Sequence, residues 1–388
     1  MKSKATLTPN ANGQVFLILL FGSLEYDGRV KRMIEVLQEI GQIMLIDLKA
    51  DRKDTESWFE GLDRISLQLL KSTNKFKQHL RFWLTSVCQS WRIKPKIVIA
   101  EDYFTCFPGL LAAKLSCAKL AYDAHELIIP EAGRKMGPRS RFWYLLERWA
   151  VGQADLVIAA NVDRAKLMAG HYELKQIPEG MRNIPPRRCQ PASPEEVLQA
   201  YPALARRNHE DRIILYQGNV SLSRGLERFV EALEFLPACY RIIVAGSGPD
   251  LDKLCTMAER FIKEARFDAL GKIENQMLPA ITPLADVGIV CYPFQGLNNI
   301  HCAPNKLFEY AQAGLPVVAT NQPPLMKALE TFKIGELVCE KNSPEQIAFI
   351  LQEVMSNKKR YRQQLESFLE ANQWKYEAER VRNAFENI

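Results

Sequence analysis

Short apolar segments alternate with longer amphipathic segments along most of this chain. In the first half, uninterrupted apolar runs of strand length recur, and such runs suit strands that are buried on both faces of a parallel sheet. The expected strands cover residues 15–20, 43–48, 97–100, 120–122 and 156–160. Between the first two, the apolar side chains of segment 29–40 fall on one helical face. The order strand, helix, strand predicts a doubly wound α/β domain.

A proline-rich break separates the two halves. Residues 183–197 contain four prolines, have no helical or strand periodicity, and end in the helix-start pattern Ser-Pro-Glu-Glu. A second alternation follows, with expected strands at 212–216, 241–245, 287–292 and 316–319, and the pattern from residue 343 onward is mostly helical. We therefore expect a first domain over 1–188, a second over 189–365, and a C-terminal helix over 366–388 that packs back on the first domain.

Length and composition narrow the class of protein. A chain of 388 residues is too long for one hydrophobic core, and 47% hydrophobic with 25% charged residues excludes a disordered or fibrous protein. The longest apolar run, residues 15–21, is far shorter than the ~20 residues of a membrane-spanning helix, and the segment before it lacks a signal-peptide layout. We expect a cytoplasmic protein.

The net charge of +6 is unevenly distributed. Residues 1–190 carry +9 and the remainder carries −3. Since no nucleic-acid-binding motif is present, the basic half predicts contact with an anionic membrane surface or an anionic acceptor. Segment 75–92 combines basic and aromatic residues at helical spacing, including Lys77 and Trp83, as a helix lying on an anionic bilayer does. A core-packed helix with basic residues outside is the alternative.

Two glycine turns of the second half are suited to anion binding. The first, Gly218-Asn219-Val220-Ser221-Leu222-Ser223-Arg224-Gly225, joins a strand to the expected helix 226–236, where backbone N–H groups and the Arg224 cation can meet an anion. The second, Gly246-Ser247-Gly248-Pro249, follows the next strand at the carboxyl edge of the sheet, where α/β folds bind ligands. Either turn can also be a plain connection.

The block P-N-K-L-F-E-Y-A-Q-A-G-L-P-V-V-A-T, residues 304–320, carries the strongest chemical signal. Pro304 starts a helix that Gly314 ends, so Lys306 lies in the first turn, where the helix dipole disfavours a cation unless an anion binds there. Glu309 lies one turn along the same face and can accept a pair of hydroxyls, such as a ribose diol. A surface Lys–Glu pair is the alternative interpretation.

The histidines do not indicate a metal site. The five histidines form neither H-x-x-H nor H-E-x-x-H, so we expect no protein-built metal centre and no bound cofactor.

Taken together, the two glycine turns and the 304–320 block resemble the nucleotide-sugar half of retaining GT-B glycosyltransferases of family 4. The first half continues the resemblance, through the loop Gly22-Ser23-Leu24-Glu25-Tyr26-Asp27-Gly28-Arg29-Val30, the segment Tyr122-Asp123-Ala124-His125-Glu126, and the passage from Leu146-Glu147-Arg148 to Ala154-Asp155-Leu156-Val157-Ile158. The resemblance implies a GT-B fold, in which two Rossmann-like doubly wound domains face each other across a cleft and the C-terminal helix crosses back to the first domain.

The resemblance also implies roles for individual residues. Arg224 and Lys306 would meet the donor diphosphate and assist its departure, and Glu309 would bind the ribose. His125 would lie near the transferred sugar. The donor site would further include these residues: Gly22, Gly218, Asn219, Gly246, Ser247, Gly248, His301 and Asn305. Two positions depart from the family pattern, since Asn219 stands in place of an arginine and His301 in place of the first glutamate of E-x7-E.

The function implied is a retaining, metal-independent transfer of a sugar from a nucleotide-diphosphate donor to a glycan or lipid-linked acceptor, in surface polysaccharide synthesis. The enzyme would be a hexosyltransferase that is cytoplasmic and peripherally associated with the inner face of the membrane. Two alternatives remain open. One is a catalytically silent partner subunit of the same fold, which His301 and Asn219 favour; the other is a nucleotide-sugar epimerase of the same fold.

Overall fold

The computed structural model describes residues 14–49, 62–68, 75–131, 133–185, 192–206, 208–274 and 277–388. The chain divides into two compact units. Unit 1 contains residues 1–183 and 375–388, and unit 2 contains residues 184–374.

Unit 1 is built on a parallel sheet with helices on both faces. Within the described residues the sheet has seven strands in the order β3-β2-β1-β4-β5-β6-β7, and every pair is parallel. Its strands are β1 (Val15–Leu20), β2 (Gln42–Leu48), β3 (Asp63–Leu67), β4 (Ile97–Glu101), β5 (Lys119–Ala124), β6 (Leu156–Ala159) and β7 (Glu179–Gly180). Its helices are α1 (Gly28–Gln38), α2 (Lys75–Ile93), α3 (Tyr103–Ser116), α4 (Pro138–Val151), α5 (Val162–Tyr172) and α17 (Trp374–Glu386).

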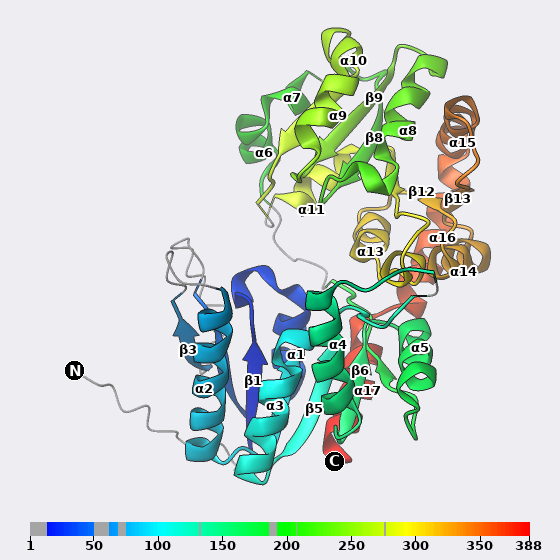
Figure 1. The fold of residues 1–388 in the computed structure, drawn as a ribbon. Coiled ribbons are helices and arrows are strands. Elements are labelled where there is room, and N and C mark those ends of the chain that lie inside the picture. Colours follow the sequence, from blue (N-terminus) through cyan, green and yellow to red (C-terminus); the bar gives the residue numbers. More distant parts are fainter. Residues whose placement is uncertain are drawn as a thin grey trace. The chain divides into compact units, whose positions relative to one another are not determined.

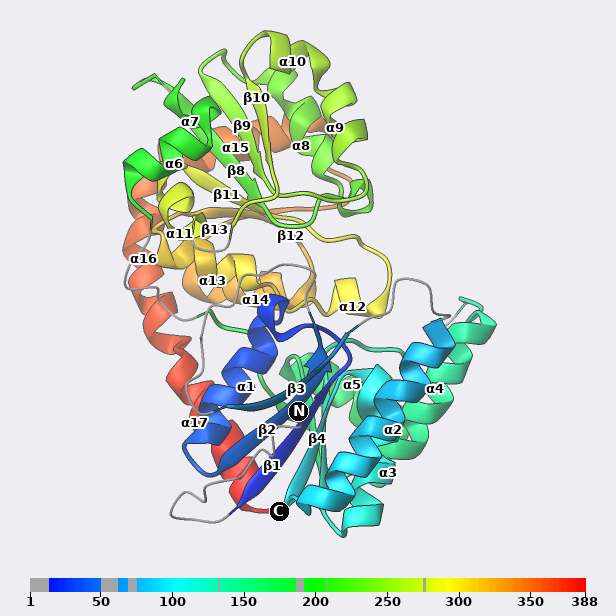
Figure 2. The ribbon, with the colours of Figure 1, turned by 90° about the vertical axis from the view of Figure 1, so that its left-hand side faces the viewer.

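The strand order places a topological switch point between β1 and β4. Strand β1 pairs with β2 on one side and with β4 on the other. The loops that follow β1 and β4 therefore lead to opposite sides of the sheet. Helices α2, α3 and α4 lie side by side over one face, and α1 and α17 lie over the other (Figures 1 and 2). Ligands of open α/β sheets bind beyond the carboxyl ends of the strands at such a point.

The last helix of the chain belongs to unit 1. Glu377 of α17 is 1% exposed and accepts hydrogen bonds from the backbone N–H of Arg182 at 2.9 Å and from its guanidinium at 2.7 Å and 2.9 Å. Phe385 packs edge-on against Phe16 of β1, with 6.4 Å between ring centroids. The preceding helix, α16 (Lys358–Ala371), packs through Leu365 and Phe368 into the core of unit 2, so the chain leaves that unit after residue 374 and not after residue 365.

Unit 2 repeats the architecture with a second parallel sheet. In the part of it that the structure describes, six strands follow the order β10-β9-β8-β11-β12-β13. They are β8 (Arg212–Gln217), β9 (Tyr240–Ala245), β10 (Phe267–Gly271), β11 (Val287–Val290), β12 (Val317–Thr320) and β13 (Gly335–Val338). The helices are α6 (Pro194–Ala200), α7 (Pro202–Ala205), α8 (Leu226–Glu231), α9 (Leu251–Met257), α10 (Glu259–Lys263), α11 (Leu278–Ile281), α12 (Leu297–Ile300), α13 (Asn305–Gln312), α14 (Pro323–Phe332), α15 (Pro344–Ser356) and α16. A separate hydrophobic cluster covers each face of the sheet.

The predicted doubly wound architecture is confirmed in both units. All nine expected strands are present, and their side chains are almost all buried, as continuous apolar runs predict. The predicted helix start at Ser193 is also present: its hydroxyl accepts the backbone N–H of Glu196 at 3.2 Å, and the Glu196 carboxylate accepts the N–H of Ser193 at 2.8 Å. Residues 186–191 of the predicted proline-rich linker lie outside the described residues.

One predicted helix is wrong in its length. Instead of a helix over 226–236, α8 ends at Glu231 and a 3-10 segment, η3 (Ala232–Phe235), follows. None of the helices in the described ranges is both long and apolar enough to cross a membrane.

Candidate functional site

The turn after β8 brings Gly218 against Lys306 of α13. Gly218 has φ of 111°, in the region that favours glycine, and a Cβ at this position would lie 3.0 Å from Lys306 Cε. Both the backbone conformation and the available space therefore require glycine here. Two of the predicted site residues, from segments far apart in the sequence, lie in direct contact.

Lys306 is a buried cation in an unusual setting. Its residue is 8% exposed, and its Nζ has no hydrogen-bond partner among the described residues. The nearest feature is the face of the Tyr216 ring, whose centroid lies 3.9 Å from Nζ. Burial, supported by the nearby charge of Arg224, lowers the pKa of Lys306 to about 8. A buried ammonium without a partner is costly unless an anion binds it, which indicates an anion site at this position.

Arg224 supplies a second positive charge at the same place. Its guanidinium carbon lies 5.2 Å from the centroid of the Tyr292 ring, in the loop after β11, and the side chain is half-buried. Lys306 lies over Tyr216 of β8, and β8 and β11 are neighbouring strands, so the guanidinium and the ammonium lie near the same end of the sheet. Helix α8 contributes little to this site, because it has only six residues.

Glu309 is held in place by a chain of side-chain hydrogen bonds. Its Oε2 accepts a hydrogen bond from Gln217 Nε2 at 2.5 Å, and Gln217 Oε1 accepts one from the Thr282 hydroxyl at 3.0 Å. Gln217 is 2% exposed. Because Gln217 fixes one carboxylate oxygen of Glu309, the orientation of the whole carboxylate is set before any ligand arrives.

The second glycine turn is explained by close packing against the first. A Cβ at Gly246 would lie 1.8 Å from the Gly218 carbonyl oxygen, and one at Gly248 would lie 2.1 Å from that of Val220. The backbone N–H of Val220 donates to the Ser247 carbonyl at 3.0 Å. Neither glycine can be replaced without moving the Gly218 turn, so both fix the backbone path beside Lys306.

The remaining predicted residues of unit 2 are arranged around this turn. Asn219 and Ser247 are exposed, and the Asn219 carbonyl accepts a hydrogen bond from the Tyr216 hydroxyl at 2.6 Å. Asn305, half-buried, begins α13 directly before Lys306. His301 follows α12, is half-buried, and donates its backbone N–H to Leu297.

The chain contains one Asp-x-Asp tripeptide, Asp250-Leu251-Asp252, a pattern that metal-using sugar transferases of another fold share. In this structure Asp250 joins the two glycine turns. Its Oδ2 accepts a hydrogen bond from the backbone N–H of Leu222 at 3.1 Å, and its Oδ1 accepts one from Lys253 Nζ at 3.0 Å. These contacts give Asp250 a structural role in the turn.

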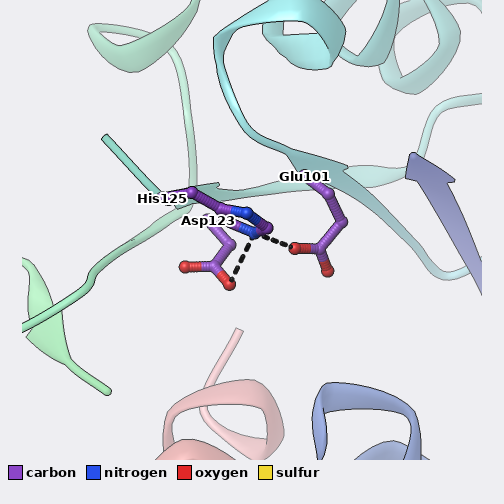
Figure 3. Close-up of side chains that lie close together, drawn as sticks. All are labelled: Glu101, Asp123 and His125. Carbon is purple, nitrogen blue, oxygen red and sulfur yellow. Dashed lines mark hydrogen bonds and ion pairs between the residues drawn. The ribbon is translucent and has the colours of Figure 1, made fainter. Parts of the chain in front are cut away.

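In unit 1, His125 belongs to a buried cluster of charged side chains at the end of β5. Its Nε2 lies 2.9 Å from Glu101 Oε2 and 3.6 Å from Asp123 Oδ2 (Figure 3). The Arg29 guanidinium donates hydrogen bonds to both carboxylate oxygens of Asp123, at 2.8 Å and 2.5 Å, and a further one to the Met181 carbonyl.

The predicted loop residue Gly22 follows β1. Only Leu20 lies near the position that a Cβ on Gly22 would take, so space does not require glycine there.

The protonation of this cluster follows from burial and charge. Burial by itself would lower the pKa of His125, but the hydrogen bonds and charges of Asp123 and Glu101 outweigh burial and raise it well above its usual value. Burial and the Asp123 charge raise the pKa of Glu101 to about 8. The Arg29 charge overcomes burial and keeps the pKa of Asp123 low. Arg29 therefore neutralises Asp123, and the raised pKa values of His125 and Glu101 favour the protonated form of each.

The same three side chains are the one group among the described residues whose ligand atoms lie close enough to hold a metal ion. Both oxygens of Asp123 already accept hydrogen bonds from Arg29, however, and His125 Nε2 is hydrogen-bonded to Glu101. A cation would have to displace both partners. The arrangement is that of an internally neutralised ion network.

Sequence reasoning missed several residues that build these two sites. Gln217, Tyr216 and Thr282 orient or cover the unit 2 site, while Arg29 and Glu101 complete the unit 1 cluster. One signal was available: Glu101 and Asp102 are two consecutive acids directly after an apolar strand, at the edge of the sheet where ligands bind.

Comparison with known proteins agrees with this geometry. Residues 200–368 match the family model described as Glycosyl transferases group 1. By sequence, no curated protein matches the chain significantly. Among solved structures, Anabaena Alr3699/HepE in complex with UDP-glucose has a TM-score of 0.74 at 14% identity, covering 96% of this chain and 100% of that chain. WaaG, a glycosyltransferase involved in lipopolysaccharide biosynthesis, has a TM-score of 0.69 at 16% identity, covering 95% and 98%.

A UDP-N-acetylglucosamine 2-epimerase is similar as well, with a TM-score of 0.57 at 12% identity, covering 91% of this chain and 90% of that chain. Likeness at these identities shows the fold and not the reaction. The family match falls on unit 2, which contains Lys306 and the two glycine turns. The chain therefore has the GT-B fold, and residues 200–368 match the Glycosyl transferases group 1 model.

Proposed function

We propose that this protein is a retaining, metal-independent glycosyltransferase of family 4 that transfers a hexose from a nucleotide-diphosphate sugar to a glycan or lipid-linked acceptor in surface polysaccharide synthesis. The observation that carries this proposal is the buried Lys306 ammonium beside Gly218, which has no hydrogen-bond partner among the described residues, with Arg224 close by. Two cations at a glycine turn match the charge of a diphosphate. UDP is the first nucleotide to test, since the Alr3699/HepE structures hold UDP.

The proposed chemistry uses these charges in the transition state. As the bond between the sugar and the diphosphate breaks, negative charge grows on the leaving oxygens, and Lys306 and Arg224 are already in place to stabilise it. Retention would follow from attack on the face that the diphosphate leaves, with the leaving phosphate taking the proton of the acceptor hydroxyl. For His125 we propose contact with the transferred sugar, as the resemblance implies.

The deciding experiment supplies labelled UDP-glucose and other nucleotide sugars together with a membrane lipid extract and follows the label. Transfer to lipid or glycan supports the proposal. Conversion of the nucleotide sugar without an acceptor would instead identify an epimerase. Absence of both transfer and nucleotide binding would identify a silent partner subunit, for which His301 and Asn219 are the reasons in the sequence.

Replacing Glu309 with alanine is expected to weaken UDP binding about 10- to 100-fold, because the ribose hydroxyls would lose the carboxylate that Gln217 holds in place to accept their hydrogen bonds. The sharper readout is the ratio of affinities for UDP and 2′-deoxy-UDP. The unmodified protein should prefer UDP, and Glu309→Ala should bind both equally. The matched control is Glu330→Ala, an exposed glutamate on α14. An unchanged preference in Glu309→Ala would remove Glu309 from the ribose site.

We further propose that unit 1 associates with an anionic membrane through helices α2, α3 and α4. Exposed apolar side chains form a stripe along α2 at Phe76, Leu80, Leu84 and Trp91, and a second along α4 at Phe142, Leu145 and Trp149. Exposed cations surround them: Lys75, Lys77, Arg81, Arg92, Lys114, Arg139, Arg141 and Arg148. The one acid in these helices, Glu147, is buried. We call this surface the basic-aromatic face.

The structure changes which residues of α2 belong to this proposal. Trp83 packs inward, 5.1 Å from the Phe107 ring and 6.4 Å from the Trp143 ring. Its replacement would disturb packing between helices and would not report on membranes. Lys77 is exposed and remains part of the basic-aromatic face. Apolar stripes flanked by cations are typical of surfaces that insert into the boundary of an anionic bilayer.

Charge reversal at Lys77 and Arg81 is expected to reduce binding to vesicles containing anionic phosphatidylglycerol at least about tenfold, because each cation near such a surface contributes roughly 1 kcal/mol. Trp91→Ser should weaken it further. Co-sedimentation measures the effect, with neutral phosphatidylcholine vesicles as the lipid control. Phe349→Ser, which removes an equally exposed apolar side chain from unit 2, is the matched protein control. Equal binding to neutral and anionic vesicles would contradict the proposal.

A further inference from the structure

Tyr216 is a buried aromatic residue near the end of β8, shortly before the first glycine turn. It has no exposed surface, and its strand has neighbours on both sides, β9 and β11. The ring belongs to one of the two hydrophobic clusters of unit 2. Its hydroxyl donates a hydrogen bond to the Asn219 carbonyl at 2.6 Å. The side chain therefore links the core of the sheet to the turn that follows the strand.

Three contacts connect Tyr216, the glycine turn and Lys306. The Lys306 Nζ lies 3.9 Å from the centroid of the Tyr216 ring. The Tyr216 hydroxyl holds the turn at Asn219, and a Cβ on Gly218 would lie 3.0 Å from Lys306 Cε. Each of the three parts thus contacts the other two. Because the ring and the hydroxyl belong to one rigid phenol group, Tyr216 fixes the ammonium relative to the turn.

A ring and a carboxylate hold a cation with different consequences. A carboxylate forms an ion pair that cancels the charge of an ammonium, whereas the face of an aromatic ring attracts the ammonium and leaves its net charge intact. Glu309, one turn along α13 from Lys306, is bound through its Oε2 to Gln217. Lys306 Nζ itself has no hydrogen-bond partner within the described ranges. The ring therefore holds the ammonium without cancelling its charge.

The second cation of the proposed donor site also lies over a ring. The guanidinium carbon of Arg224 lies 5.2 Å from the centroid of the Tyr292 ring, in the loop after β11. Strands β8 and β11 are neighbours, so the two pairs of cation and ring belong to adjacent strands. A tyrosine ring beside each cation indicates a common way of holding positive charge in this part of unit 2.

We propose that Tyr216 is a positioning residue of the donor site: its ring holds the Lys306 ammonium beside the glycine turn, and its hydroxyl fixes that turn. This inference rests on the proposed function and deepens it, because it names a residue that acts on the diphosphate through Lys306. The diphosphate meets a cation that is in place before it binds, which lowers the cost of ordering the site.

Few groups affect the protonation of Lys306. Burial lowers its pKa to about 8, and the titratable and charged groups that act on it further are Cys291, Arg224 and Glu309. Burial raises the pKa of Cys291 to about 11 and also raises the pKa of the Tyr216 hydroxyl, so both stay protonated near pH 8. Arginine and glutamate side chains do not ordinarily change charge in this range. The midpoint of Lys306 can therefore report on its contact with the ring.

The test weakens the attraction of the ring for a cation and leaves the size of the ring almost unchanged. Tyr216→Phe is prepared with zero, one, two or three fluorine atoms on the ring, since each fluorine draws electron density away from the ring face. The Lys306 midpoint is measured by NMR of ¹³C-labelled lysine in the unliganded protein, and Lys306→Met identifies the signal. Because the ring stabilises the ammonium, the midpoint should fall by about 0.5–1 pH unit from the plain to the trifluorinated ring.

UDP affinity is measured by isothermal titration on the same samples. In the fluorinated series the affinity should begin to fall at a correspondingly lower pH, and it should agree within about twofold at pH 6, where Lys306 is charged in every variant. The hydroxyl has a different effect. Tyr216→Phe without fluorine should bind UDP about three- to tenfold more weakly than the unmodified protein at every pH, with the same Lys306 midpoint, because the turn loses its bond at Asn219.

Tyr240→Phe with the same fluorinated rings is the matched control. Tyr240 is also buried, but it begins β9, where it pairs with Arg212 at the opposite end of the sheet from the glycine turns. Neither the Lys306 midpoint nor the UDP affinity should change in this series.

The outcomes separate this inference from the proposed function. A Lys306 midpoint that does not follow fluorination would overturn the inference, and so would equal UDP affinity of Tyr216→Phe and the unmodified protein. In both cases UDP binding by the unmodified protein leaves the proposed function in place. If no protein of the series, the unmodified one included, binds UDP, the donor site fails and the positioning role of Tyr216 fails with it.

Discussion

Replacing Lys306 with methionine is expected to weaken UDP binding at least about 100-fold at pH 7 and, at the same time, to stabilise the unliganded protein. The affinity falls because a buried cation that has no other described partner is lost from the diphosphate site. The stability rises because methionine has similar volume and removes an unpaired buried charge. The shift in pKa from 10.5 to about 8 corresponds to an unfavourable contribution to stability on the order of 3 kcal/mol.

The pH dependence has a definite sign. Below about pH 8, Lys306 is charged in both the folded and the unfolded protein, and the folded protein carries the full cost of burying it. Between pH 8 and 10.5 the folded protein releases the proton and the unfolded chain keeps it, so the contribution of Lys306 to stability becomes less unfavourable as the pH rises. UDP affinity runs the opposite way and should fall above pH 8, as the ammonium is lost.

Isothermal titration and thermal melts measure both effects on one preparation. Lys359→Met is the control, since Lys359 is exposed on α16 and lies outside the proposed site. It should change neither UDP affinity nor melting temperature appreciably. If Lys306→Met kept its affinity for UDP, or if it melted at a lower temperature, the lysine would be a structural group and the donor site would have to be sought elsewhere.

Replacing Arg29 with methionine is expected to destabilise unit 1 by about 3–5 kcal/mol, the usual cost of removing one partner from a buried ion pair. Arg29 is 5% exposed and makes two hydrogen bonds to Asp123, which has no exposed side-chain surface. Without the guanidinium, Asp123 is left buried beside Glu101. Urea denaturation at pH 7 should show the loss as a lower midpoint.

Two further measurements distinguish this ion network from a surface pair. Lys119→Met breaks the exposed pair with Asp155 and should cost less than about 1 kcal/mol. In Arg29→Met, the uncompensated burial raises the pKa of Asp123 above its value in the unfolded chain, so the destabilisation should shrink as the pH is lowered toward 5 and Asp123 takes up a proton. A loss that is independent of pH would contradict the charge-based explanation.

The elements that pattern alone predicted are those with continuous apolar runs. Strands such as β1 and β4 are buried on both faces, so every residue carries the signal. Edge strands were not predicted: β3 has alternating intermediate and exposed side chains, and β13 has only four residues, Gly335–Val338. The short α8 was predicted too long, because helical periodicity does not reveal where the chain tightens to 3-10 geometry.

The unit 2 site shows the same division. Pattern and resemblance indicated Gly218, Arg224, Lys306 and Glu309 as separate residues on three segments. Their spacing could not show that Gly218 and Lys306 are in contact, nor that Gln217 holds Glu309, because these contacts join β8 to α13 across the sheet edge. In the same way Trp83 had the pattern of a membrane-facing residue, and only the packing of α2 on α3 and α4 directs it inward.

The sequence by itself determined the two doubly wound units, the glycine turns and the resemblance to nucleotide-sugar transferases, because these depend on local periodicity and on short motifs. Only the tertiary structure decided which charges are buried, which are paired, and which lack a partner. Lys306 and Arg29 are ordinary charged residues along the chain; their distinct properties come from the elements that fold over them, since the free energy of a charge depends on its surroundings in space.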